Sequence, residues 1–132
     1  MTSAPSHAWF SESRPGLVVL RFPAQFSDAD VQLAISALES FFRKTERTQA
    51  WIVDLSDIER TTARQRGWFA EYEKRVAEMT SRYVTRAAYI APNQIVRGIL
   101  TAVFWIQSPV YPHRVFSDRA DGERWACADT SL

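Results

Sequence analysis

The 132-residue sequence contains few of the residues from which covalent and metal-supported sites are built. Its single cysteine, Cys127, excludes an internal disulfide and is typical of a reducing compartment. One cysteine and two histidines, His7 and His113, far apart along the chain, do not make a zinc-binding set. The four glycines form neither a GxGxxG fingerprint nor a P-loop, and no GxSxG motif occurs. We therefore expect no metal ion, no cofactor and no enzymatic activity.

Net charge and long apolar runs are also scarce. Sixteen basic and fifteen acidic residues leave a formal charge of +1, so no overall field attracts nucleic acid or an acidic membrane. No segment approaches the roughly 18 apolar residues that span a bilayer. The opening MTSAPSHAWF has neither the basic start nor the apolar stretch of a signal peptide. We expect a cytoplasmic protein with no nucleic-acid partner and no integral membrane segment.

Apolar and aromatic residues, in contrast, are abundant. They make up 46% of the chain, with five tryptophans and eight phenylalanines, which predicts a packed core. We assign residues 1–132 to a single domain, with the small polar residues 1–6 as a loose tail. The central stretch is QAWIVDLSDI at residues 49–58. Its apolar run is typical of a strand buried on both faces, and the loop after such a strand is where sites are built.

Strand and helix patterns alternate along the chain. Two strand-like runs, His7–Ser13 and Leu17–Phe22, flank a turn signal and predict an antiparallel hairpin. We expect the following elements in this order: a helix of about 17 residues capped by Ser27, the strand in 49–58, a helix that begins between Glu59 and Arg66 and reaches Tyr83, a strand at Val84–Ala91, a helix at Asn93–Gln107, a strand at Arg114–Phe116 and a helix capped by Ser117. This order predicts an α/β fold. Its mixed, mostly parallel sheet has about five strands, an N-terminal antiparallel hairpin and about four covering helices.

This element order resembles the STAS domain, especially its SpoIIAA-like, STAS/SEC14-related branch. The likeness runs from about His7 to Trp125, and two segments carry it: VDLSDI at the end of the central strand, and YIAPNQIVRGILTAVFW. It implies the STAS fold and a bacterial regulatory or scaffolding protein that acts by protein–protein interaction. In the anti-sigma-factor antagonists, an Asp-Ser-Ser-Gly motif follows the central strand. A partner kinase phosphorylates its first serine.

The chain departs from that family at the phosphoacceptor. Counted without gaps from Asp54, the Asp-Ser-Ser positions fall on Thr62, Ala63 and Arg64, so an alanine replaces the serine. Thr61 or Thr62 could substitute only if the loop is shifted. The resemblance therefore implies a non-catalytic interaction module that lacks the usual phosphoacceptor. The SEC14 relation implies an alternative, a binder or carrier of a small apolar ligand or lipid, although 132 residues leave little room for an enclosed pocket.

The start of the second predicted helix is the first candidate site. Free N–H groups at a helix N-terminus, together with guanidinium groups, can hold an anion or a phosphorylated side chain of a partner. In the alternative, a threonine caps the helix and the arginines are solvated. The carboxylates of Asp54 and Asp57 could serve acid–base or metal chemistry, but such residues more often cap a helix or bind loop amides. The predicted partner- or anion-binding residues are Asp57, Arg60, Thr61, Thr62, Arg64 and Arg66.

The third predicted helix is the second candidate. Arg97 is the only charged residue of its Ile95–Gln107 stretch, so the helix is apolar almost all round and should be buried on more than one side. We expect the sheet to bury one stripe, formed by Ile95, Ile99, Ala102 and Ile106. A neighbouring helix, a homodimer or other protein interface, or an apolar ligand could cover the second face. For an interface we single out Val96, Leu100, Phe104 and Trp105.

Overall fold

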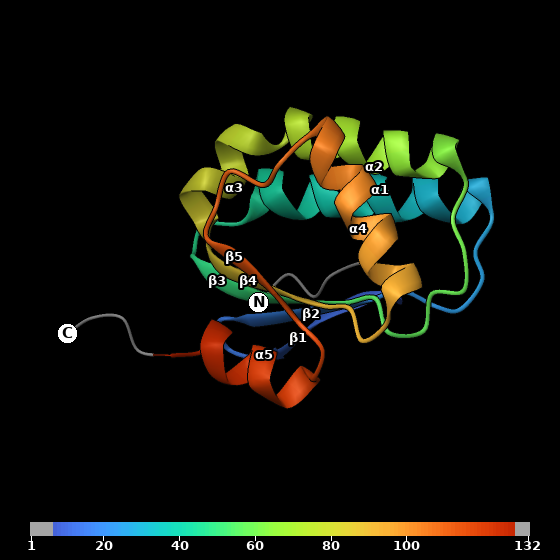
Figure 1. Ribbon diagram of the computed structural model, residues 1–132. Coiled ribbons are helices and arrows are strands. Elements are labelled where there is room, and N and C mark those ends of the chain that lie inside the picture. The colour runs from blue at the N-terminus through green and yellow to red at the C-terminus, as the bar shows by residue number, and fades with distance from the viewer. Residues whose placement is uncertain (1–6, 129–132) are drawn as a thin grey trace.

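A computed structural model describes residues 7–128 as one sheet between two unequal helical layers (Figure 1). Helices α1 to α4 cover one face, whereas α5 lies alone against the other (Figure 1). The elements are β1 (Phe10–Arg14), β2 (Leu17–Arg21), α1 (Asp28–Lys44), β3 (Gln49–Asp54), α2 (Ala63–Arg75), α3 (Ala77–Tyr83), β4 (Val84–Ile90), α4 (Gln94–Ile106), β5 (His113–Phe116) and α5 (Arg119–Ala126).

The sheet has the predicted mixed topology. Its strands lie in sequence order, β1-β2-β3-β4-β5; the first two are antiparallel and every other pair is parallel. Gly16, with a φ of +84°, makes the hairpin turn, a conformation that residues with a Cβ rarely adopt. Because parallel crossovers share one hand, a steady strand order places the connecting helices on one face of the sheet. The expected α/β class with an N-terminal hairpin is confirmed.

Strand β3 is the centre of the sheet, as the sequence predicts. All six of its residues are buried, and its side chains alternate between the two layers. Trp51 and Val53 join the large core under α1 to α4, whereas Ala50 and Ile52 join the small core under α5. The two faces therefore have separate cores.

Two local expectations need correction. The helix expected to continue to Tyr83 is interrupted at Val76, where φ is −95° and ψ is 3°, so α2 and α3 are separate helices. The break lets buried Val76 and Thr80 both stay inside while the chain turns toward β4. Asp118, not Ser117, caps α5, because its Oδ1 accepts the N–H of Ala120. In contrast, the Ser27 cap of α1 is confirmed.

Helix α4 presents the opposite stripe to the core from the one we expected. Val96 and Leu100 are buried, at 0% and 5% exposure, whereas Ile95 and Ile106 are exposed. The reason is that α4 does not lie flat on the sheet: it runs steeply past α2, against which it packs (Figure 1). Arg97 fixes the rotation, since its Nε donates to the carbonyl oxygen of Ala91 at 2.9 Å. Val96 and Leu100, expected at an interface, thus face inward and cannot touch a partner.

Candidate functional site

Three side chains of the predicted anion-binding turn already have partners within the protein. Thr62 caps α2 through a capping box with Gln65, so its hydroxyl accepts the backbone N–H of Gln65. Asp57 pairs with Arg21 at 2.8 Å, and Arg64 pairs with Asp28 at 3.3 Å. One of the three guanidinium groups expected to attract an anion, that of Arg64, is therefore neutralised.

Two arginines of the predicted set have no carboxylate partner within residues 7–128. Arg60 is exposed and lines a shallow depression together with Thr61 and Thr62. Arg66 is partly buried, and its Nη1 donates to the carbonyl oxygen and the hydroxyl of Thr61 at 3.0 and 2.9 Å. The anion site stays a prediction, with these two guanidinium groups as its remaining cations. Ala63, which the gap-free count from Asp54 matched to the phosphoacceptor, is the first residue of α2.

The carboxylate of Asp54 has a structural role. It is buried, its Oδ1 accepts the N–H of Ser56 at 2.9 Å, and its Oδ2 pairs with Arg119 of α5 at 3.3 Å. It therefore fixes the turn after β3 and ties that turn to α5. Across residues 7–128, no group of three His, Cys, Asp or Glu side chains lies close enough to hold a metal ion.

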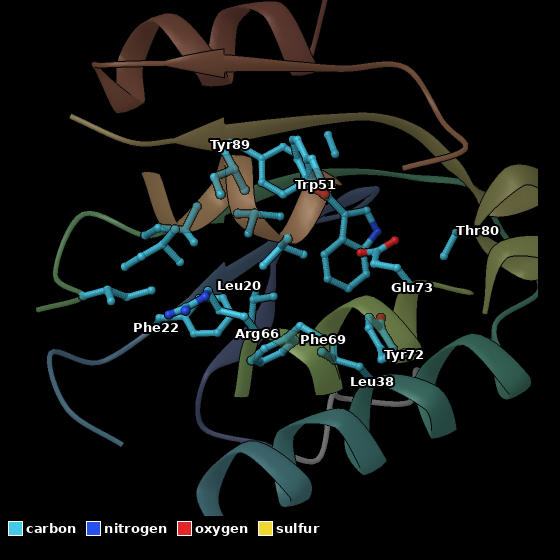
Figure 2. Close-up of a pocket in the computed structure, with 18 of the residues that line it drawn as sticks. Leu20, Phe22, Leu38, Trp51, Arg66, Phe69, Tyr72, Glu73, Thr80 and Tyr89 are labelled. Carbon is cyan, nitrogen blue, oxygen red and sulfur yellow. The ribbon is translucent and has the colours of Figure 1, made fainter. Parts of the chain in front are cut away.

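A cavity lies inside the large core, between the sheet and the helical layer (Figure 2). The space open to the centres of water-sized molecules is about 100 Å³. Leu20, Trp51, Val53 and Ala87 form its floor on the sheet. Its walls come mainly from α1, α2 and α4, and include Leu38, Phe42, Phe69, Leu100, Val103 and Phe104. The cavity is small and not fully enclosed, which agrees with the little room for an enclosed pocket that the length of the chain led us to expect.

Alternation along the strands explains why the cavity is apolar. Residues at every second position of β2, β3 and β4 face the helical layer, and these are Leu20, Trp51, Val53, Ala87 and Tyr89. Ala87 contributes only a methyl group to this floor. Interiors are normally close-packed, with few voids larger than a water molecule.

Polar groups gather at one end of the cavity. Tyr89 and Tyr111 share a hydrogen bond of 2.6 Å between their hydroxyls, and the Tyr111 hydroxyl donates to the Glu73 carboxylate at 3.2 and 3.3 Å. Burial raises the pKa of Glu73 to about 7, and the hydrogen bond from Tyr111 offsets only part of that rise. Burial also raises the pKa values of Tyr89 and Tyr111 well above 10, so both phenols keep their protons. Glu73 is half-buried by its exposed surface, and carboxyls with a raised pKa cluster at functional sites.

Arg66 marks the opposite end of the cavity from Glu73 (Figure 2). The two labelled groups lie on either side of the apolar floor residues, Arg66 beside Phe22 and Glu73 beside Trp51 and Tyr72 (Figure 2). Two residues of the predicted anion-binding set, Thr61 and Arg66, therefore line the cavity. Phe104, predicted at an interface, also lines the cavity and packs edge-on against Tyr89 at 5.2 Å.

Comparison with solved structures shows one clear similarity. An uncharacterised protein of the DUF3478 family from Shewanella loihica PV-4, described as having a SpoIIAA-like fold, matches with a TM-score of 0.55. The match covers 84% of this chain and 82% of that one, at 13% identity. This chain has a SpoIIAA-like fold. At that identity the likeness concerns the SpoIIAA-like fold alone.

No protein-family model matches the sequence, and no curated protein matches it. No helix within residues 7–128 is both long and apolar enough to cross a membrane. Evidence on the site of this SpoIIAA-like protein therefore comes from its own geometry, above all from the cavity.

Sequence reasoning missed the polar end of the cavity. Glu73 and Tyr111 are 38 residues apart, so no local pattern connects them. A signal did exist: Glu73 lies four residues after Phe69 and three before Val76, which places a charged residue on the apolar stripe of its helix. A carboxyl at such a position must either turn outward or find a buried partner, and Tyr111 is that partner.

Proposed function

We propose that this protein binds a small apolar molecule in the cavity between its sheet and helices α1, α2 and α4. The observation that carries the proposal is the cavity itself, about 100 Å³ in volume and lined mostly by aromatic and aliphatic side chains. An engineered apolar cavity of about 150 Å³ in another protein stays dry and binds benzene or xenon. A guest of one aromatic ring or a short alkyl chain therefore suits this volume, whereas a phospholipid does not.

The proposed activity is binding, without chemistry on the guest. We propose a regulatory module in which the bound molecule affects contact with another protein. A specific feature of α4 supports this second function: Trp105 is 87% exposed, and its neighbour Ile106 is 63% exposed. The inner side of the same helix lines the cavity through Leu100 and Phe104. If a guest binds more tightly to one position of α4, it also favours the arrangement of Trp105 and Ile106 that belongs to that position.

The binding function is tested by filling the cavity. Ala87→Val adds two carbons at the cavity floor, so we expect toluene affinity to fall at least tenfold, with thermal stability unchanged or raised. Toluene binding is measured by isothermal titration calorimetry on the full chain.

The adjacent residue provides the matched control. Ala88 faces the small core, beneath α5, and is fully buried. We expect Ala88→Val to lower stability by about 1–3 kcal/mol through overpacking while toluene affinity changes less than twofold. Equal loss of toluene binding in both variants, or no binding to the wild type up to the solubility of toluene, would refute the binding proposal.

A further inference from the structure

Trp51 has a buried hydrogen-bond donor that no acceptor within residues 7–128 satisfies. The residue is 4% exposed and stacks on Phe42 at a centroid distance of 5.3 Å, which fixes the plane of the indole. Its Nε1 is fully buried and has no partner within the part of the chain described, residues 7–128. An unpaired buried donor costs about 1–3 kcal/mol. The other such atom, Gln49 Oε1, belongs to a residue that does not line the cavity.

The Trp51 donor lies at the polar end of the cavity. Both Trp51 and Glu73 line the cavity, and in the view of Figure 2 the nitrogen lies on the side of the indole that faces the Glu73 carboxyl. The two groups make no hydrogen bond with each other. The nitrogen itself has almost no surface open to a water-sized molecule, so a guest atom near the carboxyl accepts from it only when the surrounding side chains shift.

Counting donors and acceptors defines what that atom must be. The Tyr111 proton goes to Glu73, so the Tyr89 proton goes to Tyr111, and neither phenol has a proton left for a guest. Glu73 keeps lone pairs that accept a further hydrogen bond, while Trp51 can only donate. A single group that accepts from Trp51 and donates to Glu73 would satisfy both, and a hydroxyl does this.

We propose that the guest is a small apolar molecule with one hydroxyl group, of the phenol or short-chain alcohol class. Its ring or chain lies on the floor formed by Ala87 and Val53, and its hydroxyl oxygen accepts the Trp51 N–H. Its hydroxyl proton goes to the Glu73 carboxyl. This inference rests on the proposed binding function and adds the chemical class of the guest.

A pair of probes of nearly equal shape tests the inference: phenol, and toluene, in which a methyl group replaces the hydroxyl. Dissociation constants of both are measured by calorimetry for the wild type, for Trp51→Phe and for Glu73→Gln. Trp51→Phe also changes the shape of the cavity floor and can alter the affinity for both probes, so the comparison between them is the measure. A hydrogen bond contributes about 0.5–1.5 kcal/mol, so Trp51→Phe should weaken phenol about three- to tenfold more than it weakens toluene. The same change at the exposed indole, Trp105→Phe, is the matched control and should affect neither probe.

A second readout reports on the donor itself. In a ¹H–¹⁵N spectrum the Trp51 indole N–H signal, identified by its loss in Trp51→Phe, should move downfield with phenol and much less with toluene. Retained toluene binding shows that Trp51→Phe is folded.

The outcomes separate the two proposals. If toluene does not bind the wild type, the cavity proposal fails and this inference fails with it. If toluene binds but Trp51→Phe weakens both probes equally, the cavity proposal stands and the hydroxyl inference is overturned. The hydroxyl inference is also overturned if phenol leaves the chemical shift of the Trp51 indole N–H unchanged. In that case the N–H donates to a trapped water molecule or has no partner.

Discussion

At the scale of single residues, Glu73 is an acidic side chain partly withdrawn from solvent. Its carboxyl lies against the cavity, its pKa is raised from 4.5 to about 7 by burial, and one phenol donates to it. The unfolded chain ionises this group near pH 4.5, whereas the folded chain ionises it near pH 7. Between these values the folded state binds more protons, so the free energy of unfolding must fall as pH rises.

This linkage gives a prediction for Glu73→Gln. The pKa difference corresponds to about 3 kcal/mol, which is fully present below pH 4.5 and lost by about pH 7. Glutamine cannot ionise and can still accept from Tyr111. We therefore expect the variant to exceed the wild type in stability by up to about 3 kcal/mol at pH 8 and to match it near pH 4.5. Urea unfolding at several pH values measures this.

The control for that measurement lies on the same helix. Glu71 is exposed, so Glu71→Gln should leave the pH profile of the wild type unchanged. If the Glu73→Gln and wild-type curves run parallel from pH 4.5 to 8, Glu73 is not the buried acid that its position suggests.

The roles of site residues were predictable only where neighbouring residues in the sequence indicate them. The Thr62 cap and the paired Asp54 follow from residue types near the end of a strand and the start of a helix. The ion pair of Arg64 with Asp28 joins residues 36 apart. Such a pairing depends on how α1 and α2 pack together, which the sequence pattern does not specify.

At the scale of elements, the small core under α5 shows how close packing decides what a position accepts. Gly122 of α5 lies against β4: a Cβ added there would be 2.6 Å from Cδ1 of Ile90 and 3.3 Å from Cβ of Ala88. The small residue at each contact lets helix and sheet approach. The small core therefore has no free space at Gly122, whereas the large core on the opposite face of the sheet contains the cavity.

Two glycine substitutions should therefore have opposite effects. Gly122→Ala forces Ile90 to shift within a filled core, so we expect a loss of about 1–3 kcal/mol. Gly67, inside α2, has nothing within 4 Å of the added carbon, so Gly67→Ala should stabilise by about 0.5–1 kcal/mol through helix propensity. Thermal unfolding of both variants measures the difference. A loss of stability in Gly67→Ala would show that α2 is packed differently.

The order of elements was predictable, but the rotation of α4 was not. Periodicities of two and 3.6 residues are properties of neighbouring residues, so strands and helices can be identified one at a time. Helix α4 is apolar on nearly every side, so its own pattern favours no single face. The rotation of α4 is fixed by contacts outside the helix: Arg97 donates to the carbonyl oxygen of Ala91 at 2.9 Å and to the hydroxyl of Ser117 at 2.6 Å.

At the scale of the whole molecule, the two layers differ in what they can do. Helix α5 lies on one face of the sheet, over the small core, whereas α1 to α4 cover the other face (Figure 1). The cavity lies on the side of α1 to α4. The cavity was not predictable, because it is the small difference between the space that the backbone encloses and the side chains that fill it. No sequence segment carries that difference alone.

Helix α4 joins the cavity to the outer surface, and this supports a prediction about assembly. A second copy of the chain is the first partner to test, since exposed Trp105 and Ile106 offer an apolar contact. We expect Trp105→Ser to weaken self-association at least tenfold in sedimentation velocity, because a large aromatic side chain is the kind of residue that dominates interfaces. Leu33→Ser, which removes a 63% exposed side chain on α1, is the matched control.

The same experiment tests whether cavity and surface are coupled. If α4 transmits the presence of a guest, saturating toluene should change the association constant of the wild type, and by reciprocity the dimer should bind toluene with an affinity different from that of the monomer. Ala87→Val, with its cavity filled, should respond to toluene much less. A wild type that remains monomeric at every concentration would exclude self-association. An association constant that toluene leaves unchanged would make the cavity and the outer face of α4 independent sites.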